Sequence, residues 1–339
     1  MTNREIAITR FVRSLGCALL LTLAAITFVA ISRIYNPDSP YIENLDIENL
    51  GIAFPSANTW LRYAGLSVAI GGFLNLVIAV VMVLINRSFN VLRTVSLTFA
   101  GLFLLMQSAV PHLTFYLSDG LFMGLGMLLA ITLMFTSYLH REGTPRVFLA
   151  FFIIGCGALW RLPWLAFLPA MFGGLIQMRI LSLRTVLAAA LGVVTPLWIV
   201  WGLGLSDITL WTLPELSFDT SSLHGNPTLQ HSLAVGAVSL TCGALLGIAN
   251  LFKILSYNAA TRAYNGLLLT VSVTTGVMSI IDWQHISLYL TLLNACTAFQ
   301  AGHFLKINIQ RRGYLPILVI IAVYVTLSVS TMFIPKLWV

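Results

Sequence analysis

Apolar runs of about 20 residues recur from one end of this 339-residue chain to the other. In helical form, a stretch of this length crosses the hydrocarbon core of a bilayer, which is about 30 Å thick. Only 9% of the residues are charged, whereas soluble proteins carry about a quarter. The sequence therefore predicts a polytopic membrane protein of the all-α class.

Charged or turn-forming residues bound these runs and divide the chain into about eleven predicted segments. The segments are 14–32, 63–85, 94–110, 119–138, 147–160, 164–178, 185–204, 232–252, 264–281, 286–304 and 314–333. No soluble domain fits between them. We therefore expect one integral membrane domain over residues 1–339, a transmembrane helical bundle with outer loops at 33–60 and 206–230.

The basic residues predict the orientation of this bundle. If the amino terminus is cytoplasmic, fourteen of the eighteen Lys and Arg residues lie inside, which is the bias expected for short loops. These are Arg4, Arg10, Arg13, Arg87, Arg93, Arg141, Arg146, Arg179, Arg184, Lys253, Arg262, Lys306, Arg311 and Arg312; the outer four are Arg33, Arg62, Arg161 and Lys336. The net charge of +7 therefore reports orientation, and nucleic-acid binding has no support.

The stretch GALWRLPWLAF, residues 157–167, interrupts the apolar run from Val147 to Met178. A charge at the bilayer centre costs roughly 3 kcal/mol. A single span here would move every later loop to the other side and reverse the basic bias. We therefore predict a helical hairpin at 147–178 with its turn, 160–164, facing outward. Each arm measures only about 22 Å, so Arg161 is expected below the outer surface, in a cavity or headgroup layer.

Acidic residues favour the opposite side, because nine of the eleven carboxylates fall on the predicted outer face. Asp119, in YLSDGLFMG, is interpreted either as a helix cap together with Ser118 or as an acid facing the same cavity as Arg161. Arg161 either reaches lipid headgroups between two tryptophans or binds a phosphate or carboxylate, for which a guanidinium fork is suited.

The outer loops add further candidates. Asp38 and Asp46 in loop 33–60 are interpreted as a general base, a metal ligand or part of a solvated polar loop. His112 is a third substrate-binding candidate beside Arg161 and Asp119. No HxxH or HExxH spacing occurs, so no metal site and no cofactor are predicted from spacing, while a divalent metal assembled in three dimensions is left open.

Glycine pairs within the segments are predicted to let helices pack closely. The pairs are Gly71 and Gly72, Gly124 and Gly126, Gly155 and Gly157, and Gly173 and Gly174. None of them lies between a strand and a helix, so none is interpreted as a phosphate-binding loop.

Two stretches resemble a known family. RVFLAFFIIGCGALWRLPWLAFLPAMFGGLIQMRILSLRTVLAAALGVVTPLWIVWGLG, residues 146–204, and LTLLNACTAFQAGHFLKINIQRRGYLPILVIIAVYV, residues 290–325, are similar to an uncharacterised family of polytopic inner-membrane proteins from Bacteroidetes-type bacteria. The resemblance implies a multi-pass bacterial inner-membrane protein. The basic residues, together with about eleven segments, predict a cytoplasmic amino terminus and a periplasmic carboxyl terminus. The resemblance implies no mechanism, because the function of that family is not established.

GCGALWRLP and YLSDGLFMG more distantly resemble the membrane region of C-type glycosyltransferases, which take sugars from polyprenyl-phosphate donors. Those enzymes carry their catalytic acid in the first extracytoplasmic loop, which implies Asp38 or Asp46 as the base here. The resemblance further implies that Arg161 holds the lipid phosphate and that Asp119 orients the acceptor or a divalent metal. The adjacent acidic pair common in that loop is missing from this sequence.

Three functions are carried forward from the sequence. The first is glycosyl transfer at the outer leaflet, with membrane lipids and a polyprenyl-phosphate lipid as partners. The second is a non-catalytic membrane subunit or scaffold of cell-envelope assembly, which would bind other envelope proteins. The third is a small-solute transporter, which is disfavoured because few charges fall within the predicted segments.

Overall fold

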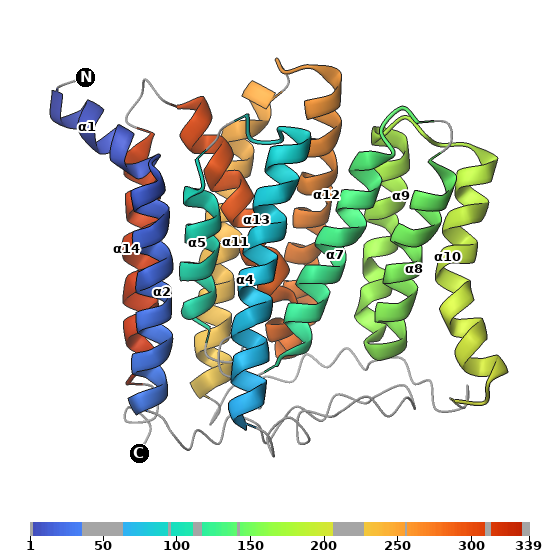
Figure 1. The fold of residues 1–339 in the computed structure, drawn as a ribbon, viewed down its shortest axis with the longest axis horizontal. Coiled ribbons are helices and arrows are strands. Elements are labelled where there is room, and N and C mark those ends of the chain that lie inside the picture. The colour runs from blue at the N-terminus through green and yellow to red at the C-terminus, as the bar shows by residue number, and fades with distance from the viewer. Residues whose placement is uncertain are drawn as a thin grey trace.

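The computed structural model of the protein describes residues 3–35, 64–93, 96–110, 117–140, 143–205, 227–254, 256–308 and 313–333. Every regular element in these ranges is a helix, and most helices lie side by side in one elongated bundle (Figure 1). In chain order they are α1 (Asn3–Val12), α2 (Leu15–Tyr35), α4 (Ala64–Phe89), α5 (Thr98–Ser108), α7 (Asp119–Thr136), α8 (Thr144–Trp160), η1 (Leu162–Phe167), α9 (Leu168–Gln177), α10 (Leu183–Gly202), α11 (Pro227–Ile254), α12 (Ala259–Ile281), η4 (Trp283–His285), α13 (Ile286–Ile307) and α14 (Tyr314–Ser330).

Six of these helices are long and apolar enough to cross a membrane, namely α2, α4, α7, α10, α11 and α12. Shorter apolar helices are α5, α8, the continuous stretch formed by η1 and α9, and α14. The all-α class predicted from the sequence is therefore confirmed for the described residues, and the apolar helices indicate a membrane-embedded protein. The predicted count of about eleven spans is not confirmed.

The outward faces of the peripheral helices are covered by large apolar side chains. Leu19 and Leu23 of α2, Phe73 of α4, Trp198 of α10 and Phe252 of α11 are each at least 60% exposed. Exposed apolar surface on this scale is unfavourable in water and marks a contact with another apolar medium. Acyl chains of a bilayer supply that medium for helices of this length.

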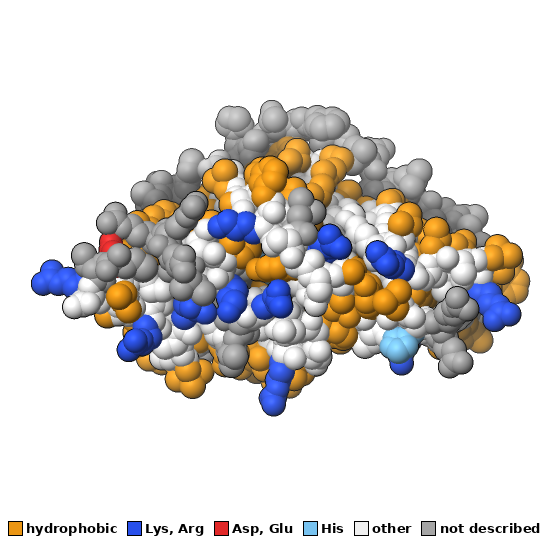
Figure 2. Space-filling model, turned by 90° about the horizontal axis from the view of Figure 1, so that it is seen from above, with side chains coloured by type: hydrophobic (Ala, Val, Ile, Leu, Met, Phe, Trp, Pro, Cys, Tyr) orange, Lys and Arg blue, Asp and Glu red, His pale blue; other side chains and the backbone are white. Residues whose placement is uncertain are grey.

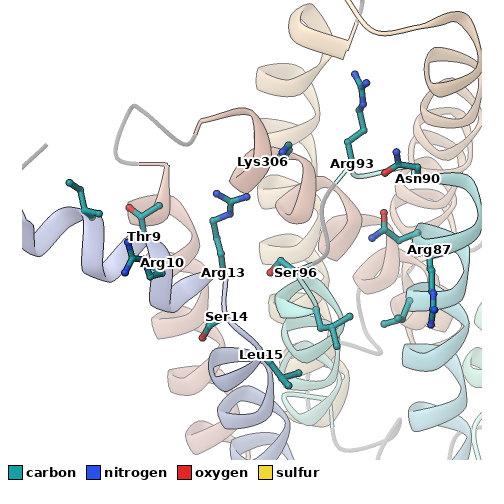
Figure 3. A pocket seen from close by; sticks show the side chains of 14 residues that line it. Thr9, Arg10, Arg13, Ser14, Leu15, Arg87, Asn90, Arg93, Ser96 and Lys306 are labelled. Carbon is teal, nitrogen blue, oxygen red and sulfur yellow. The ribbon is translucent and has the colours of Figure 1, made fainter.

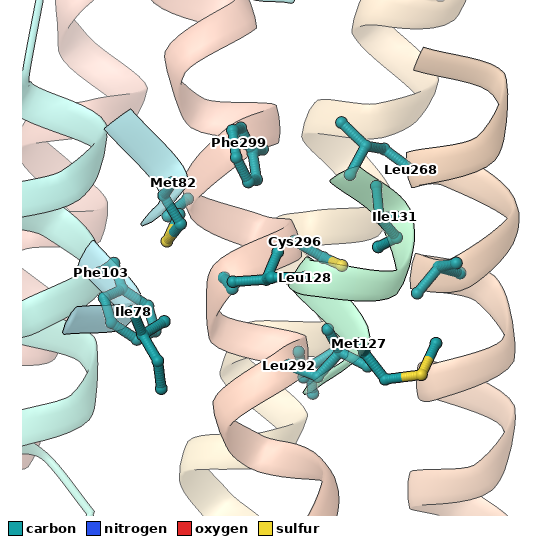
Figure 4. Packing of buried hydrophobic residues seen from close by; sticks show 14 of the residues in the cluster. Ile78, Met82, Phe103, Met127, Leu128, Ile131, Leu268, Leu292, Cys296 and Phe299 are labelled. Carbon is teal, nitrogen blue, oxygen red and sulfur yellow. The ribbon is translucent and has the colours of Figure 1, made fainter. Parts of the chain in front are cut away.

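Helix α13 lies at the centre of the bundle. Eighteen of its 22 residues are buried, and it contacts α5, α7, α11 and α12. Figure 4 shows Leu292, Cys296 and Phe299 of α13 packed among buried residues of neighbouring helices, including Met82 of α4 and Leu128 of α7. Because protein surrounds α13 on most sides, its sequence can be more polar than that of a helix facing lipid.

The apolar run at 147–178 is broken where the sequence predicts. Helix α8 ends at Trp160, and Arg161 takes up an extended backbone conformation with φ −142° and ψ 111°. The chain then continues through η1 into α9, which lies beside α8 (Figure 1). Pro163 falls in the first turn of η1, where its missing amide hydrogen leaves no helical hydrogen bond unmade.

Close packing of α8 against α10 depends on glycine. A Cβ atom added at Gly155 would lie 2.7 Å from the Val193 carbonyl oxygen, and one at Gly192 would lie 2.5 Å from that of Phe148. The prediction of close packing is therefore confirmed at Gly155. It is wrong at Gly72 and Gly173, because nothing lies within 4 Å of a Cβ added at either residue; these two glycines leave open space rather than a helix contact.

The end of the bundle that carries α1, drawn at the top of Figure 1, is strongly basic. Figure 2 shows this end face-on, with Lys and Arg side chains spread across it and a single acidic patch at its edge. The helix ends and turns found here include those near Arg13, Arg93, Arg184 and Lys306. The opposite end holds the start of α7 and the turn at Arg161.

Candidate functional site

Arg161 and Asp119, two candidates from the sequence, are in direct contact. Arg161 Nε donates a hydrogen bond of 2.6 Å to Asp119 Oδ2, and Nη2 forms an ion pair with the same oxygen. Arg161 is 8% exposed, while the Asp119 side chain is 23% exposed. The structure therefore brings together one basic and one acidic candidate in a half-enclosed corner between the end of α8 and the start of α7. We call this arrangement the α7–α8 corner.

Local structure fixes both partners of this pair. Asp119 is the first residue of α7, where a negative charge is favoured by the helix dipole. Arg161 follows the last residue of α8, and its amide donates to the Gly157 carbonyl oxygen at 2.7 Å. Ser118 is the N-cap residue of α7, as predicted, but the expected capping hydrogen bond is wrong, because its side chain makes no such bond to α7.

Trp164 holds the turn against α7 and α8. Its side chain is buried, and its indole ring fills the space left by two glycines. A Cβ atom added at Gly157 would lie 2.1 Å from Trp164 Cδ2, and one added at Gly126 would lie 2.5 Å from Cη2. The glycines therefore admit the indole, and the indole positions η1 so that Arg161 can reach Asp119.

An aromatic pair lies next to the ion pair. Phe122 on the first turn of α7 and Trp160 at the end of α8 have ring centroids 4.6 Å apart in a tilted arrangement. Both rings are partly exposed. The α7–α8 corner thus combines a charged pair with an apolar, partly accessible surface on the same two helices.

The pair leaves hydrogen-bonding capacity unused. Arg161 Nη1 and Ser118 Oγ are buried and have no partner among the described residues. Both contacts from Arg161 use Asp119 Oδ2, so within the same ranges Oδ1 has no protein donor. An unmade hydrogen bond at a buried polar group costs about 1–3 kcal/mol. A ligand that supplied an acceptor for Nη1 would relieve that cost, and a donor on the same ligand would pair with Oδ1.

Two opposing effects act on the pKa of Arg161. Burial lowers the pKa of the Arg161 guanidinium, and the attraction and hydrogen bond of Asp119 act in the opposite direction. Arginine starts from so high a pKa that it stays protonated. The charges of the cation and the anion in the α7–α8 corner therefore nearly cancel.

The other predicted site residues fall outside the described ranges. These are Asp38 and Asp46 in the first outer loop and His112 between α5 and α7. Of the predicted loops 33–60 and 206–230, only residues 33–35 and 227–230 are described. The proposed convergence of these residues on Arg161 stays a prediction. In the described part of the chain, no group of three or more His, Cys, Asp or Glu side chains is placed to hold a metal ion.

A second polar cluster, which the sequence reasoning did not assemble, lies where α12 gives way to α13. Asp282 accepts a hydrogen bond of 2.6 Å from His285 Nδ1 and one of 2.8 Å from the Tyr289 hydroxyl. The spacing of three and seven residues along one chain segment is the signal that could have found it. Because His285 and Tyr289 both donate to the Asp282 carboxylate, we interpret the cluster as a structural link that joins η4 to α13.

A chain of neutral polar side chains also crosses the interior, and the sequence reasoning missed it. Gln107 of α5 donates to Asn75 Oδ1 of α4 at 2.9 Å, and Asn294 of α13 donates to Gln107 Oε1 at 2.8 Å. Ser239 of α11 donates to Asn294 Oδ1 at 2.6 Å and bonds to the hydroxyl of Tyr324 on α14. Amide side chains inside apolar runs were the available signal. We call this set the polar chain.

Comparisons with known proteins add no assignment to this geometry. No protein-family model matches the chain, and neither the curated proteins nor the solved structures contain a significant match.

Proposed function

We propose that the protein is a multi-pass protein of the bacterial inner membrane that binds a polyprenyl-linked sugar at the α7–α8 corner and acts on it in the manner of C-type glycosyltransferases. In this proposal the basic end of the bundle and the amino terminus face the cytoplasm, following the positive-inside rule. The α7–α8 corner then lies toward the outer leaflet, and the carboxyl terminus is periplasmic.

The observation that carries the proposal is the unused hydrogen-bonding capacity of the Asp119–Arg161 pair. Arg161 Nη1 is a buried donor without a partner among the described residues, and Asp119 Oδ1 is an acceptor without one. A sugar hydroxyl both donates and accepts, and a phosphate ester accepts, so a sugar phosphate matches both atoms. Charge-assisted hydrogen bonds of this kind are about twice as strong as neutral ones.

The aromatic neighbours support the same ligand. Phe122 and Trp160 present partly exposed rings beside the pair. Aromatic rings supply apolar contact area to a ligand that has polar groups at its edge and an apolar face or chain. A sugar ring joined to a polyprenyl chain has both properties.

The proposed reaction moves the sugar from the polyprenyl phosphate to an acceptor hydroxyl. A carboxylate from Asp38 or Asp46 takes the hydroxyl proton, the new glycosidic bond forms at the anomeric carbon, and polyprenyl phosphate leaves with the bonding electrons. Arg161 Nη1 donates to the phosphate oxygen that gains charge, and Asp119 orients the acceptor hydroxyl or a divalent metal. His112 is kept as a further substrate-binding candidate.

The first test measures binding of a short-chain polyprenyl-phosphate hexose to the purified full-length protein. We expect Arg161→Lys, which keeps the charge but loses the planar fork, to weaken binding about tenfold. Asp282→Asn removes a carboxylate at the same end of the bundle but outside the α7–α8 corner, and should change binding less than twofold. Equal binding by wild type and Arg161→Lys would exclude the α7–α8 corner as the ligand site.

The second test separates transfer from binding. Asp38→Ala and Asp46→Ala are compared with wild type for hexose binding, for sugar transfer and for the envelope glycan of cells that carry each variant. Loss of transfer with binding retained supports a transferase. Unchanged transfer and envelope glycan in both variants and in Arg161→Ala would remove the catalytic proposal.

A non-catalytic subunit or scaffold of envelope assembly is the second candidate. The close packing of Trp164 against Gly126 and Gly157 favours it. In this reading the Asp119–Arg161 pair clamps the turn after α8 onto α7, and Trp164 completes the clamp. It predicts stable co-purification with an envelope protein and no sugar-lipid binding.

A further inference from the structure

The basic end of the bundle contains a groove that the proposed function does not use. The groove has a volume of about 1350 Å³ and lies between α1, the start of α2, the end of α4, the segment before α5 and the end of α13. Five of its lining side chains are cations, and none is acidic; the cations are Arg10, Arg13, Arg87, Arg93 and Lys306 (Figure 3). We call it the basic groove.

No protein anion neutralises these cations within the described ranges. The two ion pairs formed there, Asp119 with Arg161 and Asp282 with His285, both lie at the opposite end of the bundle. Arg93 has its guanidinium carbon 4.9 Å from the centre of the Tyr257 ring, which is a cation–π contact and leaves the charge uncompensated. A cleft lined by charges of one sign focuses the field and concentrates counter-ions.

The positions of two of the cations indicate where in the basic groove an anion would bind. In Figure 3, Arg13 extends from the junction of α1 and α2 toward Lys306 on α13, and Ser96 lies lower, between α2 and α5. Arg13 and Lys306 come from opposite ends of the sequence, so the fold places in one groove two cations that no local pattern pairs. The space between them is where an anion would contact both.

The surroundings of the groove indicate that the anion belongs to a lipid. Helix α1 leaves the direction of the bundle in Figure 1 and carries both Arg10 and the exposed apolar side chains of Ile6 and Phe11. A short helix that combines basic and exposed apolar side chains is typical of the membrane interface, at the depth of lipid headgroups. Leu15 lines the lower part of the groove, and Leu19, one turn further along α2, is 60% exposed. A phosphate held by Arg13 and Lys306 would therefore have an apolar path for its acyl chains below it.

We propose that the basic groove binds the phosphate headgroup of an anionic phospholipid of the leaflet in which the basic end lies. Basic pockets between helices at the membrane surface suit anionic headgroups, and each Lys or Arg contributes to the attraction. This inference does not depend on the function proposed for the α7–α8 corner. A free phosphate compound shares the headgroup chemistry but would make no use of the apolar flank.

The test is native mass spectrometry of the full-length protein in neutral detergent, titrated with phosphatidylglycerol or with phosphatidylcholine of the same acyl chains. We expect wild type to bind phosphatidylglycerol in preference. The double substitution Arg13→Gln/Lys306→Gln should lower that affinity about thirtyfold, because two headgroup contacts are lost. The matched control Arg179→Gln/Arg184→Gln removes two exposed charges from the same end but outside the groove, and should lower the affinity less than threefold.

Two further variants distinguish the loss of headgroup contacts from a loss of folding. The exchange Arg13→Lys/Lys306→Arg keeps both charges and should bind phosphatidylglycerol within about threefold of wild type. If the double Gln variant does not fold, the single Lys306→Gln variant is used and should lose about fivefold. Equal loss in the control pair, or displacement of the lipid by micromolar inorganic phosphate, would overturn the proposal of a lipid site.

Discussion

At the α7–α8 corner one buried guanidinium faces one carboxylate, whereas at the opposite end five basic side chains share a groove whose lining has no carboxylate. Arg161 is 8% exposed, but Arg10, Arg87 and Arg93 are all exposed. The two ends therefore handle charge differently. The α7–α8 corner brings its own counter-ion, so the cation can be withdrawn from water, while the basic groove depends on anions from its surroundings.

Because of this difference, the ion pair contributes to stability in any solvent, whereas the contribution of the basic groove depends on which anions are present. Removing one member of a buried ion pair leaves an uncompensated charge inside the protein, and the penalty is large in any solvent. Removing one of several like charges at an exposed surface relieves repulsion unless an external anion was bound there. The expected effects below follow from that contrast.

The largest expected effect comes from breaking the buried pair. Asp119→Asn leaves Arg161 without its anion, and we expect a loss of about 3 kcal/mol of unfolding free energy, at the lower end for buried pairs because Asp119 is 23% exposed. Chemical denaturation in detergent measures the change. Asp119→Asn/Arg161→Gln, which removes both charges, should regain more than about 1 kcal/mol of that loss. A double variant no more stable than the single one would show that the pair is not electrostatically coupled.

The turn at Arg161 could be predicted from the sequence because its signals are local. An arginine and a proline inside an apolar run mark a break whatever the rest of the chain does. The contact between Arg161 and Asp119 joins residues 42 positions apart, and it depends on Trp164 seating in the space left by Gly126 and Gly157. Sequence reasoning could name both charges as candidates, but only the packing determines that they touch.

The predicted number of spans exceeds the six candidates mainly because four predicted segments form short helices of 10–17 residues, namely α5, α8, the η1–α9 stretch and α14. Helix α13 is not counted for a different reason. Hydropathy reports how well a helix suits lipid, and α13 is surrounded by other helices and has little contact with lipid. It can therefore carry Asn294 and Gln300, and it does not qualify as a span by composition. The polar chain was missed because pairing Asn294 with Gln107 requires knowing which faces of α5 and α13 meet.

The second expected effect tests how the α7–α8 corner is positioned. Gly157→Ala places a Cβ atom 2.1 Å from Trp164 Cδ2, so the indole must move and the turn with it. Overpacking of this kind costs about 2 kcal/mol. Gly173→Ala is the matched control, because nothing lies within 4 Å of its added Cβ; it should be neutral or slightly stabilising. Denaturant unfolding and the tryptophan emission maximum report both changes. If the two variants were equally stable, the close packing of the Trp164 indole against Gly157 would not contribute to stability.

The third expected effect concerns the polar chain, which is buried but uncharged. Asn294→Ala leaves Gln107 Oε1 and the Ser239 hydroxyl each short of a partner. Hydrogen bonds between membrane helices are worth about 0.6 kcal/mol on average, so losing two should cost about 1 kcal/mol. Thr241→Val removes an exposed hydroxyl that bonds only within its own helix and serves as the control. If Asn294→Ala lowered the unfolding free energy more than Asp119→Asn does, neutral polar groups would contribute more to stability than the ion pair.

The smallest expected effect has a sign that depends on the lipid. In neutral detergent Arg13→Gln should raise stability by less than about 1 kcal/mol, because it removes one of five like charges from the basic groove. With phosphatidylglycerol present the same substitution should lower stability relative to wild type, because a ligand that binds the folded state stabilises it more when its dissociation constant is lower. Thermal unfolding with and without the lipid measures both signs. Arg184→Gln, on the same face but outside the groove, should show no reversal. A stability loss for Arg13→Gln in both conditions would mean that Arg13 has a protein partner and that the basic groove, like the α7–α8 corner, is neutralised from within.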